Sequence, residues 1–221
     1  MSLPLSSATP DIVLVLDPAN STGYCLVSIS TPAEVAIIYE YGFLDVDTTS
    51  DYSGDWCLNL QAQLRAIINR HSVQHIAMED FFFSKRFANG SKVNVELRTA
   101  IAMLAREMGL LYTILGISEW KKFISGRSTP TKEQKKKWGH ARAKKLAIQE
   151  ALWLRYNIRF PNHSRSKKTN KPIAFRLDIV DVVAQAIYFC KIYLGVTVIK
   201  TVVKVPKDVS VKGKEGFIYP N

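Results

Sequence analysis

The chain has 221 residues, is 47% hydrophobic and carries a formal net charge of +11. That length allows one globular domain with additions, and no apolar run approaches the ~20 residues of a membrane-spanning helix. The first ten residues lack the basic start and apolar centre of a secretion signal. We therefore expect an intracellular protein that makes no use of a membrane.

The cysteines point to a reducing compartment. Cys25, Cys57 and Cys190 are isolated in sequence, odd in number and without the spacing of zinc ligands. We expect three buried thiols, as in proteins of the cytoplasm or nucleoid. A viral or phage protein made inside a cell fits the same expectation.

Positive charge is concentrated in one quarter of the chain. Residues 120–176 hold 17 of the 30 Lys and Arg but only 2 of the 19 Asp and Glu. Many Lys-rich stretches are merely solvated helix faces. A surplus this large without interleaved acids instead favours a polyanion as partner.

The first half of the chain predicts strands before helices. Three strand-like runs joined by short turns predict an antiparallel meander. A later strand follows a crossover long enough to make it parallel to its neighbour. The expected elements are strands over 12–17, 24–29 and 35–43, a helix over 56–70, a strand over 74–79, a helix that follows a polar loop (84–91) and ends near 108, and a strand over 110–117.

The second half is basic and then apolar. We expect a short segment over 120–126, one basic helix over 133–156, a polar basic loop over 157–173 and an apolar closing helix over 176–194. A tail strand over 196–205 follows. The expected domains are a core over 11–194, with the basic insertion 157–173, and a C-terminal extension over 195–221.

This order of elements resembles the ribonuclease H-like fold. It is an α/β fold with a five-stranded mixed sheet, three strands antiparallel and two parallel, flanked by helices. The tail adds an extra strand. If the first and fourth strands are parallel neighbours, their carboxyl ends lie at the same edge, about 5 Å apart.

Four acids fall at that edge. Asp17 and Glu79 end the first and fourth strands, and Asp178 and Asp181 share one face at the start of the closing helix. Taken singly, each has a structural alternative as a turn cap, a strand end or a helix cap. Together, carboxylates this close repel unless cations separate them. Mg²⁺ prefers oxygen ligands, and two such ions ~3.5–4 Å apart can activate water for phosphodiester hydrolysis.

Four segments, in order, resemble the RuvC family of Holliday junction resolvases, over about residues 11–194. They begin with Asp17-Pro18-Ala19 and Thr22-Gly23, and continue with the apolar strand that ends at Glu79 and its aromatic successors. The third runs from Trp120 through Lys121, Gly126 and Lys132, and the fourth covers residues 178–184. The family more often has Gly at Ala19 and Ser128, and Ala at Val182.

The resemblance implies a function and a set of residues. Asp17, Glu79, Asp178 and Asp181 would bind two Mg²⁺ ions, or Mn²⁺ in their place, with no nucleotide cofactor. Lys132 would assist at the scissile phosphate. The substrate would be four-way junction DNA, which a homodimer would cut in both symmetric strands. The expected DNA contacts are Phe82, Lys85, Arg86, Lys121, Lys122, Arg127, Lys135 and Lys136.

Three other functions remain open from the sequence. A related ribonuclease H-like nuclease could cut flaps, forks or RNA. A DNA-junction-binding protein could keep the basic surface without catalysis. The Asp17 and Thr22-Gly23 motif is also similar to the first phosphate motif of actin-like ATPases, but those proteins need two lobes and a second phosphate loop.

Overall fold

The computed structural model describes residues 11–30, 35–46, 52–80, 88–160, 163–165, 172–174 and 178–202. A six-stranded mixed sheet has the strand order β5-β4-β1-β2-β3-β8. Its strands are β1 (Asp11–Asp17), β2 (Ser21–Ser30), β3 (Val35–Asp45), β4 (His75–Glu79), β5 (Leu111–Leu115) and β8 (Val198–Thr201). The helices are α1 (Ser53–His71), α2 (Ala88–Glu107), α3 (Ile117–Ser125), α4 (Lys132–Trp138), α5 (His140–Tyr156) and α6 (Asp178–Ile192).

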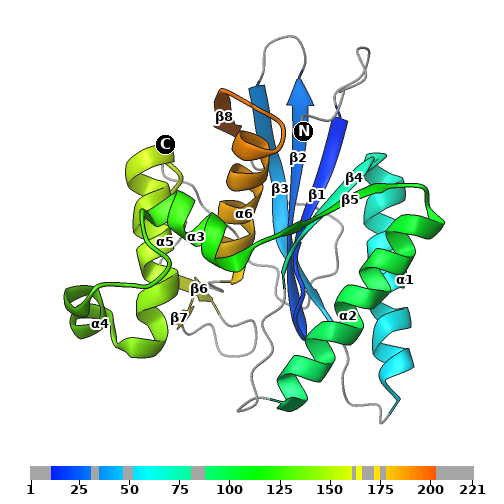
Figure 1. Ribbon diagram of the computed structural model, residues 1–221, viewed down its shortest axis with the longest axis horizontal. Coiled ribbons are helices and arrows are strands. Elements are labelled where there is room, and N and C mark those ends of the chain that lie inside the picture. Colours follow the sequence, from blue (N-terminus) through cyan, green and yellow to red (C-terminus); the bar gives the residue numbers. More distant parts are fainter. Residues whose placement is uncertain are drawn as a thin grey trace.

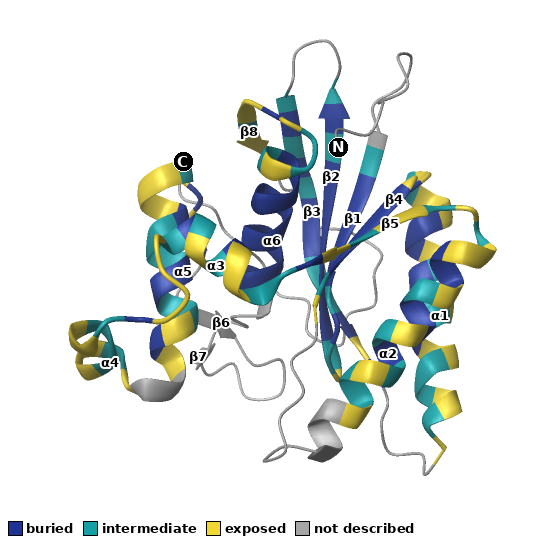
Figure 2. Ribbon diagram, in the orientation of Figure 1, coloured by how far each residue is buried: buried dark blue, intermediate teal, exposed yellow. Residues whose placement is uncertain are grey.

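Helices cover both faces of the sheet (Figure 1). Helices α1 and α2 pack on one face, and α6 lies against the other with α3 and α5 outside it. This three-layer arrangement confirms the predicted α/β class. Each layer buries one face of the sheet, so the central strands are buried on both sides (Figure 2).

The predicted pairing of the first and fourth strands is confirmed. Strands β1, β2 and β3 form the antiparallel meander, and β4 pairs with β1 in parallel. Leu16 and Met78 are the last pair in that parallel register. Because Asp17 and Glu79 each follow a member of this pair, the two acids end their strands at the same level.

Alternation along β1 and β4 decides which face the two acids occupy. Val13 and Val15 of β1 and Ala77 of β4 belong to the core on the α6 face. Leu14, Leu16, Ile76 and Met78 belong to the core on the α1–α2 face. Side chains of a strand alternate between faces, so Asp17 and Glu79 continue the series that points toward α6.

Helix α6 brings the last acids to the same edge. Its residues from Ile179 to Cys190 are all buried, and it packs on β1, β2, β3 and β4 as well as on α3 and α5. A helix that is apolar all round is suited to this central position. Its first turn, with Asp178 and Asp181, lies at the carboxyl edge of β1 and β4.

The prediction of one basic helix over 133–156 is wrong. The chain forms two helices, α4 and α5, which meet at Gly139 with φ 77° and ψ 150°. That backbone conformation favours glycine and breaks the helix. Thr131 is the N-cap of α4 and forms a capping box with Gln134. The Thr131 hydroxyl accepts from the Gln134 backbone N–H, and the Gln134 side-chain oxygen accepts from the Thr131 backbone N–H.

The C-terminal part also differs in detail. The tail strand is shorter than predicted, Val198–Thr201, and joins the edge of the sheet in parallel with β3. The basic loop contains a short hairpin of β6 (His163–Arg165) and β7 (Pro172–Ala174). The rest of 161–177 and residues 203–221 lie outside the described residues, and the domain boundaries remain predictions.

Every helix in the part of the chain that the structure describes is too short or too polar to cross a membrane. All three cysteines are free thiols, and Cys25 and Cys190 are buried as predicted. The prediction of a buried thiol is wrong for Cys57, which is only half-buried and donates to the Glu96 carbonyl.

Candidate active site

Three of the four predicted acids gather at the carboxyl edge of β1 and β4. The side chains of Asp17 and Glu79 share a hydrogen bond, and the charge of Asp181 acts on Glu79. The charge of Asp17 in turn acts on Asp181. The side chain of Asp178 lies outside what the structure describes, although its backbone begins α6 one turn before Asp181.

Glu79 is largely buried and has two partners from α3, a hydrogen-bond donor and a cation. The indole Nε1 of Trp120 donates to its Oε1 at 2.9 Å, and Lys121 Nζ lies 3.9 Å from the same oxygen. Burial raises the pKa of Glu79, and the charge of Asp181 adds to that rise. The hydrogen bonds with Asp17 and Trp120 and the charge of Lys121 oppose it.

Asp181 is held by a lysine from α5. Lys145 Nζ lies 3.4 Å from Asp181 Oδ2, and Asp181 is 8% exposed. Burial raises the pKa of Asp181 to about 6; Lys145 opposes the rise and Asp17 adds to it. Burial and the neighbouring negative charge therefore both disfavour the ionised form of Asp181.

The donor chemistry of this cluster fits a hard divalent cation. Asp17, Glu79 and Asp181 present carboxylate oxygens, which Mg²⁺ and Mn²⁺ prefer, and a cation would stabilise the charged forms of Glu79 and Asp181, whose pKa values burial raises. Among the side chains that the structure describes, no three His, Cys, Asp or Glu groups are already spaced to enclose an ion. The acids must therefore adjust to hold one.

The turn after Asp17 is closed without the glycine that the family often has there. The Thr22 hydroxyl donates to the Ala19 carbonyl at 2.7 Å and accepts from the Ala19 amide at 3.3 Å. Thr22 is fully buried beneath the turn. This pair of bonds gives the Asp-Pro-x-x-x-Thr spacing a structural reason, since the threonine fixes the backbone that presents Asp17.

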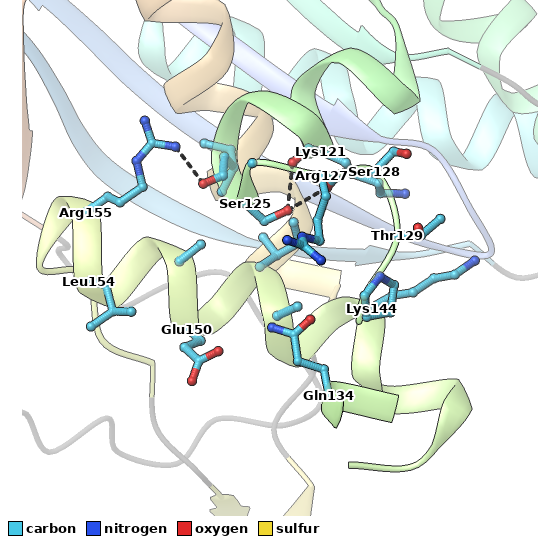
Figure 3. A pocket seen from close by; sticks show the side chains of 16 residues that line it. Lys121, Ser125, Arg127, Ser128, Thr129, Gln134, Lys144, Glu150, Leu154 and Arg155 are labelled. Carbon is cyan, nitrogen blue, oxygen red and sulfur yellow. Dashed lines mark hydrogen bonds between the residues drawn. The ribbon is translucent and has the colours of Figure 1, made fainter. Parts of the chain in front are cut away.

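A basic cavity of about 360 Å³ opens beside the acids, between α3 and α5 (Figure 3). Lys121 lines this cavity and also faces Glu79, so its side chain links the cavity to the acidic cluster. Arg127 and Lys144 are exposed on its wall, and Glu150 is its single acid. Arg155 is anchored, because its guanidinium donates to the carbonyls of Phe123 and Ile124. Charge and shape here suit a nucleic-acid backbone.

The structure does not place Lys132 with the acids. Lys132 is exposed at the beginning of α4, which packs on α5 on the side away from α6 (Figure 1). Lys122 and Lys136 are exposed and Lys135 is half-buried, all in the basic segment. Phe82, Lys85 and Arg86 lie outside the described residues.

Sequence reasoning missed two residues of the site. Lys145 was one of many cations in the basic segment, and only the packing of α5 on α6 shows that it meets Asp181. Trp120 was named only as the start of a motif; it is fully buried, and its indole also orients Glu79. A buried tryptophan needs an acceptor for its N–H, and that rule could have predicted a polar partner for Trp120.

Comparison with known proteins agrees with this fold. Two solved structures share the fold, although their low identity says nothing of function. The chain is 16% identical to Thermus thermophilus RuvC in complex with a Holliday junction substrate, with a TM-score of 0.55 over 84% of this chain and 94% of that chain. It is 14% identical to the yeast mitochondrial Holliday junction resolvase Ydc2, with a TM-score of 0.52 over 84% and 80%.

Sequence comparison is more decisive. No curated protein matches the chain closely. The sequence model of the family described as crossover junction endodeoxyribonuclease RuvC matches residues 13–148, which is more than half of the chain and includes Asp17, Glu79 and the first part of the basic segment. The chain therefore belongs to the RuvC family of crossover junction endodeoxyribonucleases, the nuclease class that its four motifs predicted.

Proposed function

We propose that this junction-resolving nuclease cuts four-way DNA junctions by paired hydrolysis that depends on two Mg²⁺ ions, with Mn²⁺ able to replace them. Asp17, Glu79, Asp178 and Asp181 would hold the ions. The observation that carries the proposal is the parallel pairing of β1 with β4, which ends Asp17 and Glu79 at the same level, beside the first turn of α6 with Asp181. When bound, the ions would activate water and stabilise the leaving 3′ oxygen.

The chain's own residues orient the carboxylates and balance their charge. Trp120 holds one oxygen of Glu79 in place, so the other remains directed into the site. Lys121 and Lys145 supply two positive charges next to Glu79 and Asp181. Both ammonium groups can turn toward phosphate oxygens once ions neutralise the acids.

The basic segment would then bind the DNA backbone. Lys121 faces Glu79, Lys122 is its neighbour on α3 and Arg127 follows that helix, and Lys135 and Lys136 continue the basic segment on α4. Phe82, Lys85 and Arg86 follow Glu79 directly in sequence, which supports contacts close to the cut. Lys132 is exposed at the start of α4, so its proposed role at the scissile phosphate would require bound DNA to reach it.

A homodimer would supply the second cut. A four-way junction has two-fold symmetry, and the site described above belongs to one chain. Two copies related by that symmetry would place one acidic cluster on each of two opposite strands. Symmetric nicks leave linear duplexes with ends that a ligase can reseal.

The test is a cleavage panel with a four-way junction, a fork, a flap, a linear duplex and an RNA–DNA hybrid of matched sequence, each with Mg²⁺, Mn²⁺ or EDTA. We expect religatable linear products from the junction only when a divalent ion is present. Equal cutting of the linear duplex would contradict junction selectivity. Preferred cutting of the fork, flap or hybrid would assign one of the alternative substrates, and tight junction binding without cutting would assign a binding protein.

A further inference from the structure

Gln185 is a buried polar residue that the acidic cluster does not yet account for. It lies on α6 one helical turn after Asp181 and is fully buried. Neither its amide oxygen nor its amide nitrogen has a hydrogen-bond partner among the residues that the structure describes. A buried amide without partners costs stability, and native proteins rarely keep one without a reason.

The position of Gln185 over the sheet follows from two contacts of α6. At the start of the helix, Asp181 acts on Glu79, the last residue of β4. Toward its end, the Phe189 ring lies 5.0 Å from the His75 ring, the first residue of β4. Gln185 lies midway between Asp181 and Phe189 on the same helix face, so it lies on the stretch of α6 between the two ends of β4.

General helix geometry directs Gln185 toward the turn that precedes it. Side chains in a helix lean toward its N-terminus and cover the preceding turn. For Gln185 the preceding turn carries Asp181, and glutamine with an acid four residues away is a favourable helix pair. The other polar pair beneath this part of α6 is already satisfied, since His75 Nε2 and Thr113 Oγ1 are 2.9 Å apart.

We propose that Gln185 is a positioning residue for the ion site: its amide Nε2–H donates to the Asp181 carboxylate oxygen that faces away from a bound divalent cation. The inference rests on the proposed function, in which Asp181 holds such a cation. Carboxylates that bind metals are usually fixed by a second hydrogen bond of this kind. The amide is unpaired while Asp181 faces Lys145, and it gains its partner when the carboxylate turns to the ion.

The test compares Gln185→Met with Gln61→Met, the same substitution on the opposite face of the sheet. Methionine keeps the length and volume of glutamine and removes the amide. Gln61 is the matched control, because its Nε2 donates to the Ala100 carbonyl at 2.8 Å between α1 and α2. The readouts are the Tm in EDTA and the Kd for Mn²⁺ alone, measured by titration calorimetry on the full chain.

We expect Q185M to keep or raise the parent Tm and to weaken the Mn²⁺ Kd about tenfold. Q61M should lower the Tm and leave the Kd unchanged. A parental Mn²⁺ Kd in Q185M would overturn the inference, and so would unfolding or a Tm loss like that of Q61M, because the amide would then be needed without an ion. If the parent chain itself binds no Mn²⁺, the proposed function fails and this inference fails with it. If the parent binds Mn²⁺ and Q185M binds it with the same Kd, only this inference fails and the proposed function stands.

Discussion

The indole nitrogen of Trp120 donates a 2.9 Å hydrogen bond to Glu79 Oε1 and thereby joins α3 to the end of β4. Trp120 is fully buried, and its neighbour Lys121 approaches the same oxygen at 3.9 Å. Residues on successive positions of one helix thus orient an acid and balance its charge. The basic segment begins with these two contacts, so it and the acidic cluster share one element.

Trp120→Phe should weaken both the fold and the site. Phenylalanine fills most of the apolar volume but leaves the buried Glu79 without its donor. We expect a loss of about 2–3 kcal/mol in the free energy of unfolding and about a tenfold loss in junction cleavage. Denaturant unfolding and single-turnover cleavage measure the two effects. Trp153→Phe is the control, since Trp153 is 48% exposed on α5; equal effects in both variants would contradict the role of the indole.

Asp181 should make the ion-free protein less stable at neutral pH than in mild acid. Burial raises the pKa of Asp181 to about 6, above its ordinary value of 3.8. Between these values the folded protein holds a proton that the unfolded chain has released, so stability falls as pH rises from about 4 to 6 and stays lower above it. Asp181→Asn removes this penalty.

In EDTA, D181N should therefore exceed the parent in unfolding free energy by about 1–3 kcal/mol at pH 8. The difference should disappear below about pH 4. Urea unfolding across the pH range measures it. A D181N variant that is less stable than the parent at pH 8 would mean that the Lys145 ion pair outweighs burial.

Lys145→Met should shift the pH dependence of cleavage. Lys145 Nζ, 3.4 Å from Asp181 Oδ2, opposes the rise in the pKa of Asp181. Without this cation the pKa of Asp181 rises further, so the acid limb of the pH–rate profile should move to higher pH. Lys144→Met is the matched control from the next position, since Lys144 is exposed and lines the basic cavity. Identical profiles for K145M and the parent would show that Lys145 does not influence Asp181 during cleavage.

Arg127→Gln should reduce the salt dependence of junction binding. Each phosphate contact contributes ~0.9 to the slope of log K against log salt, so the loss of one contact should lower the slope by about that amount. Fluorescence anisotropy at several salt concentrations measures it. Arg106→Gln on α2, exposed on the other face of the sheet, should leave the slope unchanged. Equal slopes for R127Q and the parent would show that the basic cavity does not bind the backbone.

Local pattern was enough to predict part of this site. Asp17 and Glu79 each end an apolar run, and alternation along the strands fixes the face on which they lie. The length of the crossover predicted that β4 is parallel to its sheet neighbour, and the resemblance to the ribonuclease H-like fold suggested β1 as that neighbour. The apolar character of α6 required a central position, which brought Asp181 to the same edge.

Other features depend on tertiary packing that no short pattern encodes. Lys145 meets Asp181 only because α5 packs on α6, and nothing in its own surroundings separates it from Lys144. The break at Gly139 is a single residue of positive φ inside a stretch of good helix formers, so the average pattern still predicted one helix. The sequence also did not predict which strand β8 pairs with, because an edge strand can join either side of a sheet.

The central claim is that folding gathers these acids into one ion-dependent catalytic site, and Asp17→Asn tests it most directly. Junction affinity and junction cleavage in Mg²⁺ should be measured on the same preparations of the parent and D17N. The account predicts that D17N binds the junction with the parent Kd and gives no detectable cleavage. Cleavage by D17N at the parent rate would contradict the account.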